Sequence, residues 1–438
     1  MNVADSKRTA ASLERLGYRP TTKAEDADVI VLNTCVVRQS AEDKAYGRLH
    51  SLRPLKKKRP EIIINLMGCL VGIKGNPELA RIFPFVDIFS PPSDPDPLIE
   101  FLMQREGKEL EITETKKRHA LMDEGFILPP SEQGCQVTAF VPIVLGCSYA
   151  CTYCVIPYRR GAEESRPIET IYNEVRALTE QGVREVTLLG QIVDRYGLDL
   201  PKQSSLSELL HVIHDIDGLE RIRFLTSHPS WVTDELLDTV SDLPKVCEYI
   251  EVPVQAGDDV ILERMKRGYT TDNYRQLIEK IRHRISGVMI ASDVIVGFPG
   301  ETREQFQHTY DLLAELQFDV VHLARYSPRP DTVSSRRMQD DVSKEEKMRR
   351  FRALEELQAN IAARINAQYL DRKVEILVEG KQRGRWKGRT RTNKLVFFDS
   401  HEDMMGKLVH VSIEWTGPWS MQGSLVTQHQ VEPIPQSG

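Results

Sequence analysis

The sequence predicts an α/β protein in three parts: an N-terminal α/β domain, a partial (β/α)6 barrel and a small C-terminal antiparallel β-barrel. Three observations indicate this class. Two β-branched runs alternate with helical patterns near the N-terminus, and six more do so through the middle of the chain. Short alternating runs separated by glycine and charged turns fill the C-terminal region. A chain of 438 residues has room for two or three such domains.

Bulk composition indicates an ordinary globular protein. Hydrophobic residues make up 40% and charged residues 28%, and no run approaches the roughly 20 apolar residues of a membrane span. The N-terminal segment lacks the features of a secretory signal or transit peptide, so we expect a cytoplasmic protein with no membrane partner. Seven cysteines are too few for a disulfide scaffold and remain free to bind metal. A net charge of −6 confines any nucleic-acid surface to a local patch.

The N-terminal domain is predicted from alternating helical and β-branched segments. Helix, strand, helix and strand are expected in turn over residues 4–18, 29–32, 40–52 and 62–66, with Gly17 ending the first helix. Cys35 and Cys69 follow the two strands within three residues. Because open parallel sheets bind ligands at the carboxyl ends of their strands, these two cysteines predict a metal site at one sheet edge.

The central barrel is predicted after a connecting segment. Residues 90–136 are proline-rich and then highly charged, so we interpret them as a connection between domains. Six strands are then expected, with helices such as 168–182 and 274–285 between them and a polar helix over 344–370 at the end. Gly190, Ser227, Gln255 and Gly297 fall near strand ends on the face where such barrels hold their sites. The expected strands are 141–146, 185–190, 221–227, 248–254, 289–298 and 320–327.

The C-terminal region from Asp371 predicts a small antiparallel β-barrel with a basic hairpin. Its segment 381–394 contains only positive charges. One interpretation is a solvated hairpin, and the other is a nucleic-acid face, since Trp386 among cations offers a base-stacking surface beside phosphate contacts. The candidate RNA-binding residues are Lys381, Arg383, Arg385, Trp386, Lys387, Arg389 and Arg391.

Three cysteines with the spacing C-x3-C-x2-C carry the strongest chemical signal. Cys147, Cys151 and Cys154 follow a predicted strand, and no fourth cysteine lies near them in sequence. A structural zinc site would use four ligands, usually as two separated pairs. The motif could also represent buried structural cysteines or an incomplete zinc knuckle. Three thiolates on one loop can instead hold three irons of a 4Fe-4S cluster and leave the fourth iron open to a ligand.

This motif, with Tyr153 before the third cysteine, resembles the signature of the radical SAM superfamily. The resemblance implies that S-adenosylmethionine binds the open iron and is cleaved to a 5′-deoxyadenosyl radical. It also implies a cofactor pocket that includes Tyr153. The other residues that we expect in this pocket are Gly190, Gln191, Ser227, Gln255 and Gly297.

Nearly the whole chain resembles the methylthiotransferase family, through motifs that include VIVLNTCVVRQSAEDKAYGRL, IPYRRGAEESRP and DVIVGFPGET. This resemblance implies an N-terminal cluster domain over 1–120, a radical SAM barrel over 133–366 and a TRAM domain over 367–433. It implies replacement of a C–H bond by C–S–CH3 with two S-adenosylmethionine molecules and a second 4Fe-4S cluster. It further implies an electron donor such as flavodoxin or ferredoxin, and a sulfur source.

Cys35 and Cys69 match two of the three ligands that the family uses for its second cluster. The family motif G-C-Q-M-N-x-x-D-S is represented here only from MNVADS onward. We expect a start placed too far downstream, the alternative being a different third ligand, and we expect this chain to hold the second cluster weakly. Cys135 and Cys247 are assigned to structure.

Two motifs resemble the tRNA-directed branch of the family. These are TSHP at 226–229 and PVQAGDD at 253–259. The resemblance implies action on C2 of N6-isopentenyladenosine beside the anticodon (tRNA position 37), with the tRNA anticodon stem-loop as partner and a monomeric enzyme. The alternatives are a threonylcarbamoyladenosine or ribosomal-protein substrate, or a degenerate iron-sulfur RNA-binding protein. Arg159, Arg160 and Arg166 are expected either at phosphate or substrate or in salt bridges.

Overall fold

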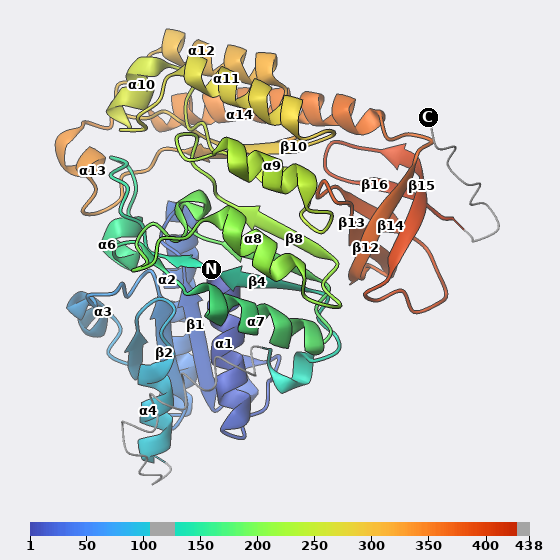
Figure 1. The fold of residues 1–438 in the computed structure, drawn as a ribbon. Coiled ribbons are helices and arrows are strands. Elements are labelled where there is room, and N and C mark those ends of the chain that lie inside the picture. The colour runs from blue at the N-terminus through green and yellow to red at the C-terminus, as the bar shows by residue number, and fades with distance from the viewer. Residues whose placement is uncertain (106–127, 427–438) are drawn as a thin grey trace.

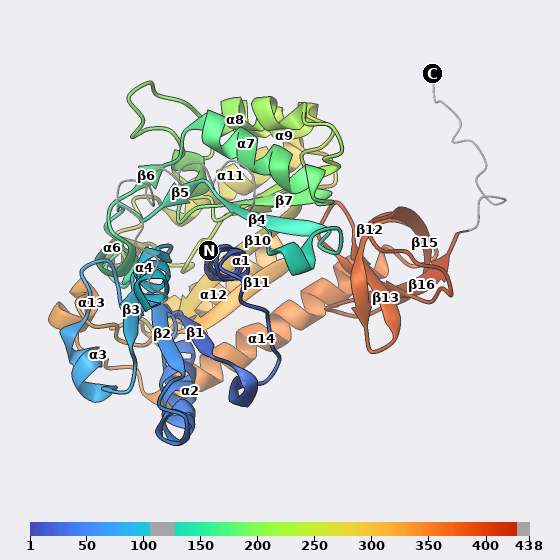
Figure 2. The same ribbon diagram turned by 90° about the horizontal axis from the view of Figure 1, so that it is seen from below.

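The computed structural model describes residues 1–105 and 128–426, in which an N-terminal domain, a half-open barrel and a small β-barrel are distinct (Figure 1). The small barrel lies at the C-terminal end of the long helix α14 (Lys344–Ala367). The N-terminal domain lies against the central barrel, away from the small barrel (Figure 2). Part of the predicted connection, residues 106–127, and the predicted domain end at 427–433 lie outside the described residues. No helix of the described segments has both the length and the apolarity needed to cross a bilayer.

The N-terminal domain is a three-stranded parallel sheet with helices around it. β2 is central and buried along its whole length, which explains its isoleucine run. The first helix ends at Arg15, with Leu16 as its cap and Gly17 following at φ +96°, so the predicted position of its end is confirmed to within two residues. The elements are α1 (Asn2–Arg15), β1 (Val29–Thr34), α2 (Gln39–Lys58), β2 (Ile63–Gly68), α3 (Pro77–Ile82), β3 (Ile88–Ser90) and α4 (Asp96–Arg105).

All six predicted barrel strands are present. They form two parallel sheets, β4-β7-β8 and β9-β10-β11, and the bridge between Ile222 and Val246 joins β8 to the chain just before β9. The strands are β4 (Thr138–Pro142), β7 (Glu185–Leu189), β8 (Arg221–Leu225), β9 (Tyr249–Glu251), β10 (Met289–Val296) and β11 (Val320–Arg325). Helices α7 (Ile168–Glu180), α8 (Leu206–His214), α9 (Asp234–Asp242), α11 (Thr271–Arg284) and α12 (Arg303–Leu316) alternate with them.

The first predicted barrel strand is divided in two. β4 ends at Pro142, and β5 (Val144–Leu145) turns away to pair antiparallel with β6 (Glu164–Ser165). The short helices α6 (Ile156–Arg160), α10 (Asp259–Arg264) and α13 (Val333–Arg337) surround the same end of the barrel. This departure from the sheet carries the cysteine loop out over the barrel mouth.

The C-terminal module is a closed barrel with the strand order β12-β13-β14-β16-β15. The prediction of a purely antiparallel barrel was wrong in one pairing, because β14 and β16 run parallel through Val396↔Met421 and Phe397↔Gln422. An odd number of strands cannot close a ring with every neighbour antiparallel, so a closed five-stranded barrel requires such a pair. The strands are β12 (Lys373–Gln382), β13 (Arg385–Arg389), β14 (Leu395–Phe398), β15 (Leu408–Thr416) and β16 (Met421–Leu425).

Candidate functional site

The loop between β5 and α6 brings the C-x3-C-x2-C cysteines to the mouth of the barrel. The Cys147 N–H donates to the Gly161 carbonyl at 3.0 Å, and the Cys154 N–H donates to the Cys151 carbonyl at 3.2 Å. Gly146 opens the loop at φ +65°, and a Cβ there would lie 1.9 Å from the Ala162 carbonyl oxygen. Only glycine can occupy that position without moving the loop.

The three thiols act on one another electrostatically. Burial, and to a lesser extent the neighbouring Cys151 and Cys147, raise the pKa of Cys154 to about 12. Burial also raises the pKa of Cys147. Buried thiols of this kind become thiolates when a metal supplies compensating positive charge.

The donor set fits an iron-sulfur cluster better than a single ion. In the described segments, no three His, Cys, Asp or Glu side chains converge closely enough for one metal ion. A four-iron cube places its thiolates on separate irons, so its ligands lie further apart. Arg267 adds a buried positive charge, and its Nη1 donates to Cys151 Sγ at 3.3 Å. Sequence reasoning missed Arg267, since more than a hundred residues separate it from Cys151.

Residues expected in the cofactor pocket lie at strand ends around this loop. Gly190 and Gln191 follow β7, and the buried Ser227 follows β8 and donates its N–H to the Glu251 carbonyl at 2.9 Å. Ser227 Oγ and the neighbouring His228 Nε2 are both buried without a protein hydrogen-bond partner. His228 packs against Tyr149 of the cysteine loop with ring centroids 4.5 Å apart. Two orphaned polar atoms beside the loop are available to a bound ligand.

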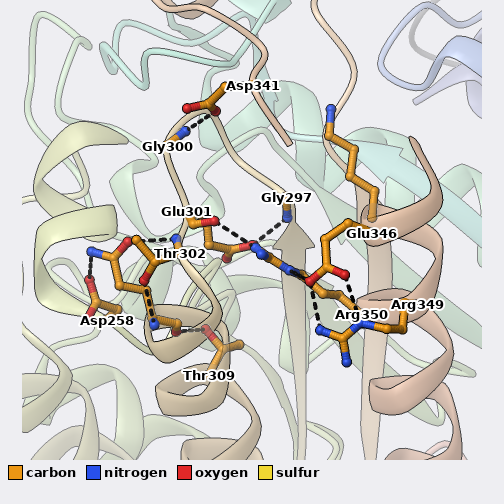
Figure 3. Close-up of polar contacts among 12 residues, drawn as sticks. Asp258, Gly297, Gly300, Glu301, Thr302, Thr309, Asp341, Glu346, Arg349 and Arg350 are labelled. Carbon is orange, nitrogen blue, oxygen red and sulfur yellow. Dashed lines mark hydrogen bonds and ion pairs between the residues drawn. The ribbon is translucent and has the colours of Figure 1, made fainter. Parts of the chain in front are cut away.

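Gly297 takes a different role from the one expected. Its N–H donates to the Glu301 carboxylate at 2.6 Å, and Glu301 forms a buried ion pair with Arg350 of α14 (Figure 3). A Cβ at Gly297 would lie 2.3 Å from Lys347 Cγ. The structure therefore assigns Gly297 to the attachment of α14 and does not place it in the pocket described next.

A pocket of about 740 Å³ lies between the cysteine loop, β10, β11, α14 and the N-terminal domain. Tyr153, Cys154 and Gln255 line it, and Gln255 adopts φ +73° there. Arg38, from the N-terminal domain, and Asp293, from β10, also line it. Burial raises the pKa of Asp293, while His322 and Arg38 lower it. Sequence reasoning missed both residues, although an aspartate inside the apolar run MIASDVIV was a usable signal.

Cys35 and Cys69 lie together at the carboxyl edge of the N-terminal sheet. The register pairs Thr34 with Gly68, so each cysteine directly follows a paired position, and the Cys69 N–H donates to the Thr34 carbonyl at 3.1 Å. Burial raises the pKa of the Cys69 thiol, and nearby Cys35 raises it too. These two thiols fit as neighbouring ligands of one cluster.

Arg160 connects the two cysteine sites. It ends α6, directly after the barrel loop, and its Nε donates to Cys69 Sγ at 3.2 Å while Nη2 donates to Asn2 at 2.8 Å and Asp5 at 3.4 Å. The neighbouring Arg159 pairs with Asp331 at 3.8 Å, and Arg166 pairs with Glu174. The structure thus favours the salt-bridge alternative for all three arginines over contacts with phosphate.

The remaining cysteines lie elsewhere. Cys247 is buried, and burial raises the pKa of its thiol to about 11. Its assignment to structure agrees with this position. Cys135 is exposed, so it does not pack in a core as a structural cysteine would.

The basic hairpin is only partly available to RNA. Trp386 is 5% exposed, packs in the small barrel's core and donates Nε1–H to the Ser400 carbonyl at 3.2 Å. Its expected stacking role was therefore wrong: in β13 the side chains alternate, so Trp386 points inward and Arg385 and Lys387 point outward. Arg391 pairs with Glu248 of the central barrel at 2.7 Å. Lys381 and Arg383 are exposed, and Arg389 pairs with Glu379 at 3.3 Å.

Two tryptophans that the sequence reasoning did not select are exposed on this module. Trp415 is 49% exposed and Trp419 is 58% exposed. Both lie where β15 turns into β16, in a sequence context without clustered charge. Strict alternation from the buried Val411 and Ile413 would place Trp415 on the buried face, but the pairing register shifts between Ile413 and Trp415 and leaves its side chain exposed, so the local pattern gave no signal for it.

Three family models match consecutive parts of the chain. Residues 141–313 match the Radical SAM superfamily, residues 1–90 match Uncharacterized protein family UPF0004, and residues 367–426 match the TRAM domain. A tRNA-2-methylthio-N(6)-dimethylallyladenosine synthase from Dehalococcoides mccartyi (strain CBDB1) is 47% identical over 97% of this chain and 96% of its own. The chain belongs to the tRNA-2-methylthio-N(6)-dimethylallyladenosine synthase family.

Further relatives agree with this membership. The synthase of the same name from Roseiflexus sp. (strain RS-1) is 46% identical, covering 97% of this chain and 87% of its own. Among solved structures, the radical S-adenosylmethionine methyltransferase TsrM from Kitasatospora setae superposes with a TM-score of 0.51 at 15% identity, covering 75% of this chain and 68% of its own. That likeness shows the shared fold. Membership of the radical SAM superfamily implies one 4Fe-4S cluster and S-adenosylmethionine.

Proposed function

We propose that this enzyme methylthiolates C2 of N6-isopentenyladenosine next to the anticodon of tRNA, at position 37. The observation that carries the proposal is that the loop of Cys147, Cys151 and Cys154 reaches, through Tyr153 and Cys154, a pocket that the N-terminal domain also lines. The substrate class follows from the activity for which the related synthases are named. A pocket of about 740 Å³ lies within the usual range for small-molecule sites and can admit one splayed-out nucleotide.

Cys147, Cys151 and Cys154 would hold the radical cluster. When bound, that cluster supplies the electron that cleaves S-adenosylmethionine and so provides the radical that removes the C2 hydrogen atom. In this chain Arg267 orients Cys151 through its hydrogen bond to the sulfur. Tyr153 lines the pocket and is held there by edge-on packing against Phe298, with ring centroids 6.5 Å apart. We further propose that Gln255, Gly190, Gln191 and Ser227 contact S-adenosylmethionine.

Cys35 and Cys69 would hold a second 4Fe-4S cluster that carries the sulfur. Their shared sheet edge and the Arg160 contact support this assignment. The reaction then needs a second S-adenosylmethionine as methyl donor, a sulfur source, and an electron donor such as flavodoxin or ferredoxin.

We propose the domain limits 1–120, 133–366 and 367–433, in line with the three matched segments. The anticodon stem-loop is the proposed partner, the enzyme is proposed to be a monomer, and the cytoplasm is the proposed location because tRNA is modified there. The exposed cations Lys381 and Arg383, with the partly exposed Arg385 and Lys387, are proposed to contact RNA phosphates.

The test is an anaerobic assay of the reconstituted chain with reductant, S-adenosylmethionine and an anticodon stem-loop that contains isopentenyladenosine. We expect both 5′-deoxyadenosine and the 2-methylthio nucleoside. Deoxyadenosine without the thiolated base would leave the radical half intact and contradict sulfur insertion by this chain. A methylthio product found only on threonylcarbamoyladenosine or a ribosomal protein would replace the proposed substrate.

A further inference from the structure

The turn between β13 and β14 is embedded in the central barrel. We call residues 389–394 the docking turn. Arg391 donates to the carbonyls of Pro244 and Val246, both at 2.7 Å, and pairs with Glu248. Lys394 pairs with Asp319 at 2.7 Å. These partners precede or open β9 and β11, so the docking turn lies against the amino ends of the barrel strands, opposite the cysteine loop.

Two arginines of β8 reach into the docking turn from the barrel. Arg221 Nη1 donates to the Arg389 carbonyl at 2.7 Å, and its Nη2 donates to Glu375 of β12 at 2.9 Å. Arg223 Nη2 donates to the Thr390 carbonyl at 2.8 Å, and its Nη1 donates to the Arg391 carbonyl. Arg223 is also paired with Glu185 at 2.9 Å.

Both arginine side chains are almost fully buried, at 1% and 3% exposed. Burying a guanidinium is unfavourable unless its donors are satisfied. Here the satisfying acceptors are largely main-chain carbonyls of another module, which cannot shift without moving that module's strands. Asn366 at the end of α14 adds a second attachment, donating to the Gly417 carbonyl at 2.8 Å. A module linked loosely to the barrel would need none of these contacts.

We infer that Arg221 and Arg223 are positioning residues for the RNA substrate, which fix the TRAM module on the barrel so that bound RNA meets the pocket at a set distance. The inference rests on the proposed function. RNA that touches the module and the pocket rim together gains affinity only while the two sites keep a matching separation. The barrel and the module thereby form one rigid binding surface for the stem-loop.

The experiment compares Arg221→Gln and Arg391→Gln with Arg275→Gln in the reconstituted full chain. Arg275 on α11 is a more exposed arginine paired with Glu315 at 2.9 Å, and its change removes the same charge away from the docking turn, so it serves as the charge-matched control. Arg223 is left intact so that Glu185 is not buried without a partner. The readouts are hydrogen exchange across residues 385–395, stem-loop Kd, and the separate kcat and KM values for methylthiolation.

We expect faster exchange in the docking turn and a rise of about tenfold in Kd and KM, the size of one lost charged hydrogen bond, with kcat changed less than about twofold. Arg221→Lys keeps the charge but cannot make both contacts, so its values should fall between wild type and Arg221→Gln. RNA-independent 5′-deoxyadenosine formation should equal that of Arg275→Gln.

Two results would overturn the inference: unchanged exchange in both variants, or faster exchange with unaltered Kd and KM. Failure of the proposed function reads differently. If the wild-type chain does not thiolate isopentenyladenosine, the proposed reaction is contradicted. If the two variants nevertheless loosen the docking turn and weaken stem-loop binding, the positioning role of the arginines still stands.

Discussion

Arg160 and Arg267 each donate a hydrogen bond to the sulfur of a cysteine in a different site. Hydrogen bonds to cluster-ligating sulfurs are one of the means by which proteins adjust iron-sulfur centres. Neither contact was predictable, because each arginine is far from its cysteine in sequence. The cysteines themselves were predictable, since three of them share one loop and two follow strands that the β-branched runs already marked.

Arg160 should matter for stability as well as for the sulfur site. Replacing it with Gln leaves Asp5, which is 2% exposed, without its cation. We expect a loss of about 3 to 5 kcal/mol in the free energy of unfolding, as for a broken buried ion pair. Urea unfolding measures it. Arg159→Gln is the matched control, because its partner Asp331 is exposed and such pairs contribute only about 0 to 1 kcal/mol. Equal losses in the two variants would contradict the buried role.

Glu251 predicts a pH dependence of stability. Burial, and then the neighbouring Asp293, raise its pKa from 4.5 to about 7. The folded chain therefore binds a proton that the unfolded chain releases, and the free energy of unfolding falls as pH rises from about 4.5 to about 7. Glu251→Gln should remove about 3 kcal/mol of that fall. Urea unfolding of the wild-type protein and of Glu251→Gln at pH 5 and pH 8 checks this prediction. An equal fall in the free energy of unfolding in the two proteins would contradict it.

At the scale of elements, helix α14 joins the pocket to the TRAM module. Lys347 and Phe351 line the pocket near its start, and Asn366 contacts the module near its end. The buried pair of Glu301 and Arg350 holds its first half, with Nη1 of Arg350 2.6 Å from the carboxylate, and Glu346 adds a second contact at 2.9 Å (Figure 3). The pocket wall and the module therefore depend on the same helix.

Removing only Arg350 from this ion pair should lower the free energy of unfolding more than replacing both charged residues. Arg350→Met leaves the Glu301 carboxylate buried, and we expect a loss of about 3 to 5 kcal/mol in the free energy of unfolding. In the double variant Glu301→Gln and Arg350→Met no charge is stranded, so part of that loss should return. Urea unfolding of the wild-type protein, Arg350→Met and the double variant measures the three free energies. A double variant less stable than Arg350→Met would show that the carboxylate is stabilised by something other than Arg350.

Most elements were predictable because their signals are local. The six barrel strands and α14 follow from β-branched runs and from a long helical pattern, which depend on neighbouring residues alone. The parallel pairing of β14 with β16 was missed, because strand order in a barrel depends on closure and not on any one segment. The use of Arg391 in an interface was missed for a related reason: its acceptors belong to residues 244–248, in another domain.

In the whole molecule, the two kinds of side chain proposed to contact RNA lie on one module. The hairpin tip offers the exposed cations Lys381 and Arg383, and the turn from β15 to β16 offers Trp415 and Trp419. Phosphate contacts release counterions and depend on salt, whereas stacking on an aromatic ring does not. The two contributions can therefore be separated by titrating salt.

Trp419→Ala should weaken binding of the anticodon stem-loop by about 1 to 3 kcal/mol while the slope of log K against log salt stays unchanged. Arg383→Gln should weaken binding and reduce that slope by about one. Leu408→Ala is the control for the tryptophan, because Leu408 is an exposed apolar side chain of the same module. Fluorescence anisotropy across a salt series measures all three. If Trp419→Ala alters the slope, or binds like Leu408→Ala, then bases do not stack on Trp419 and the module holds RNA through charge alone.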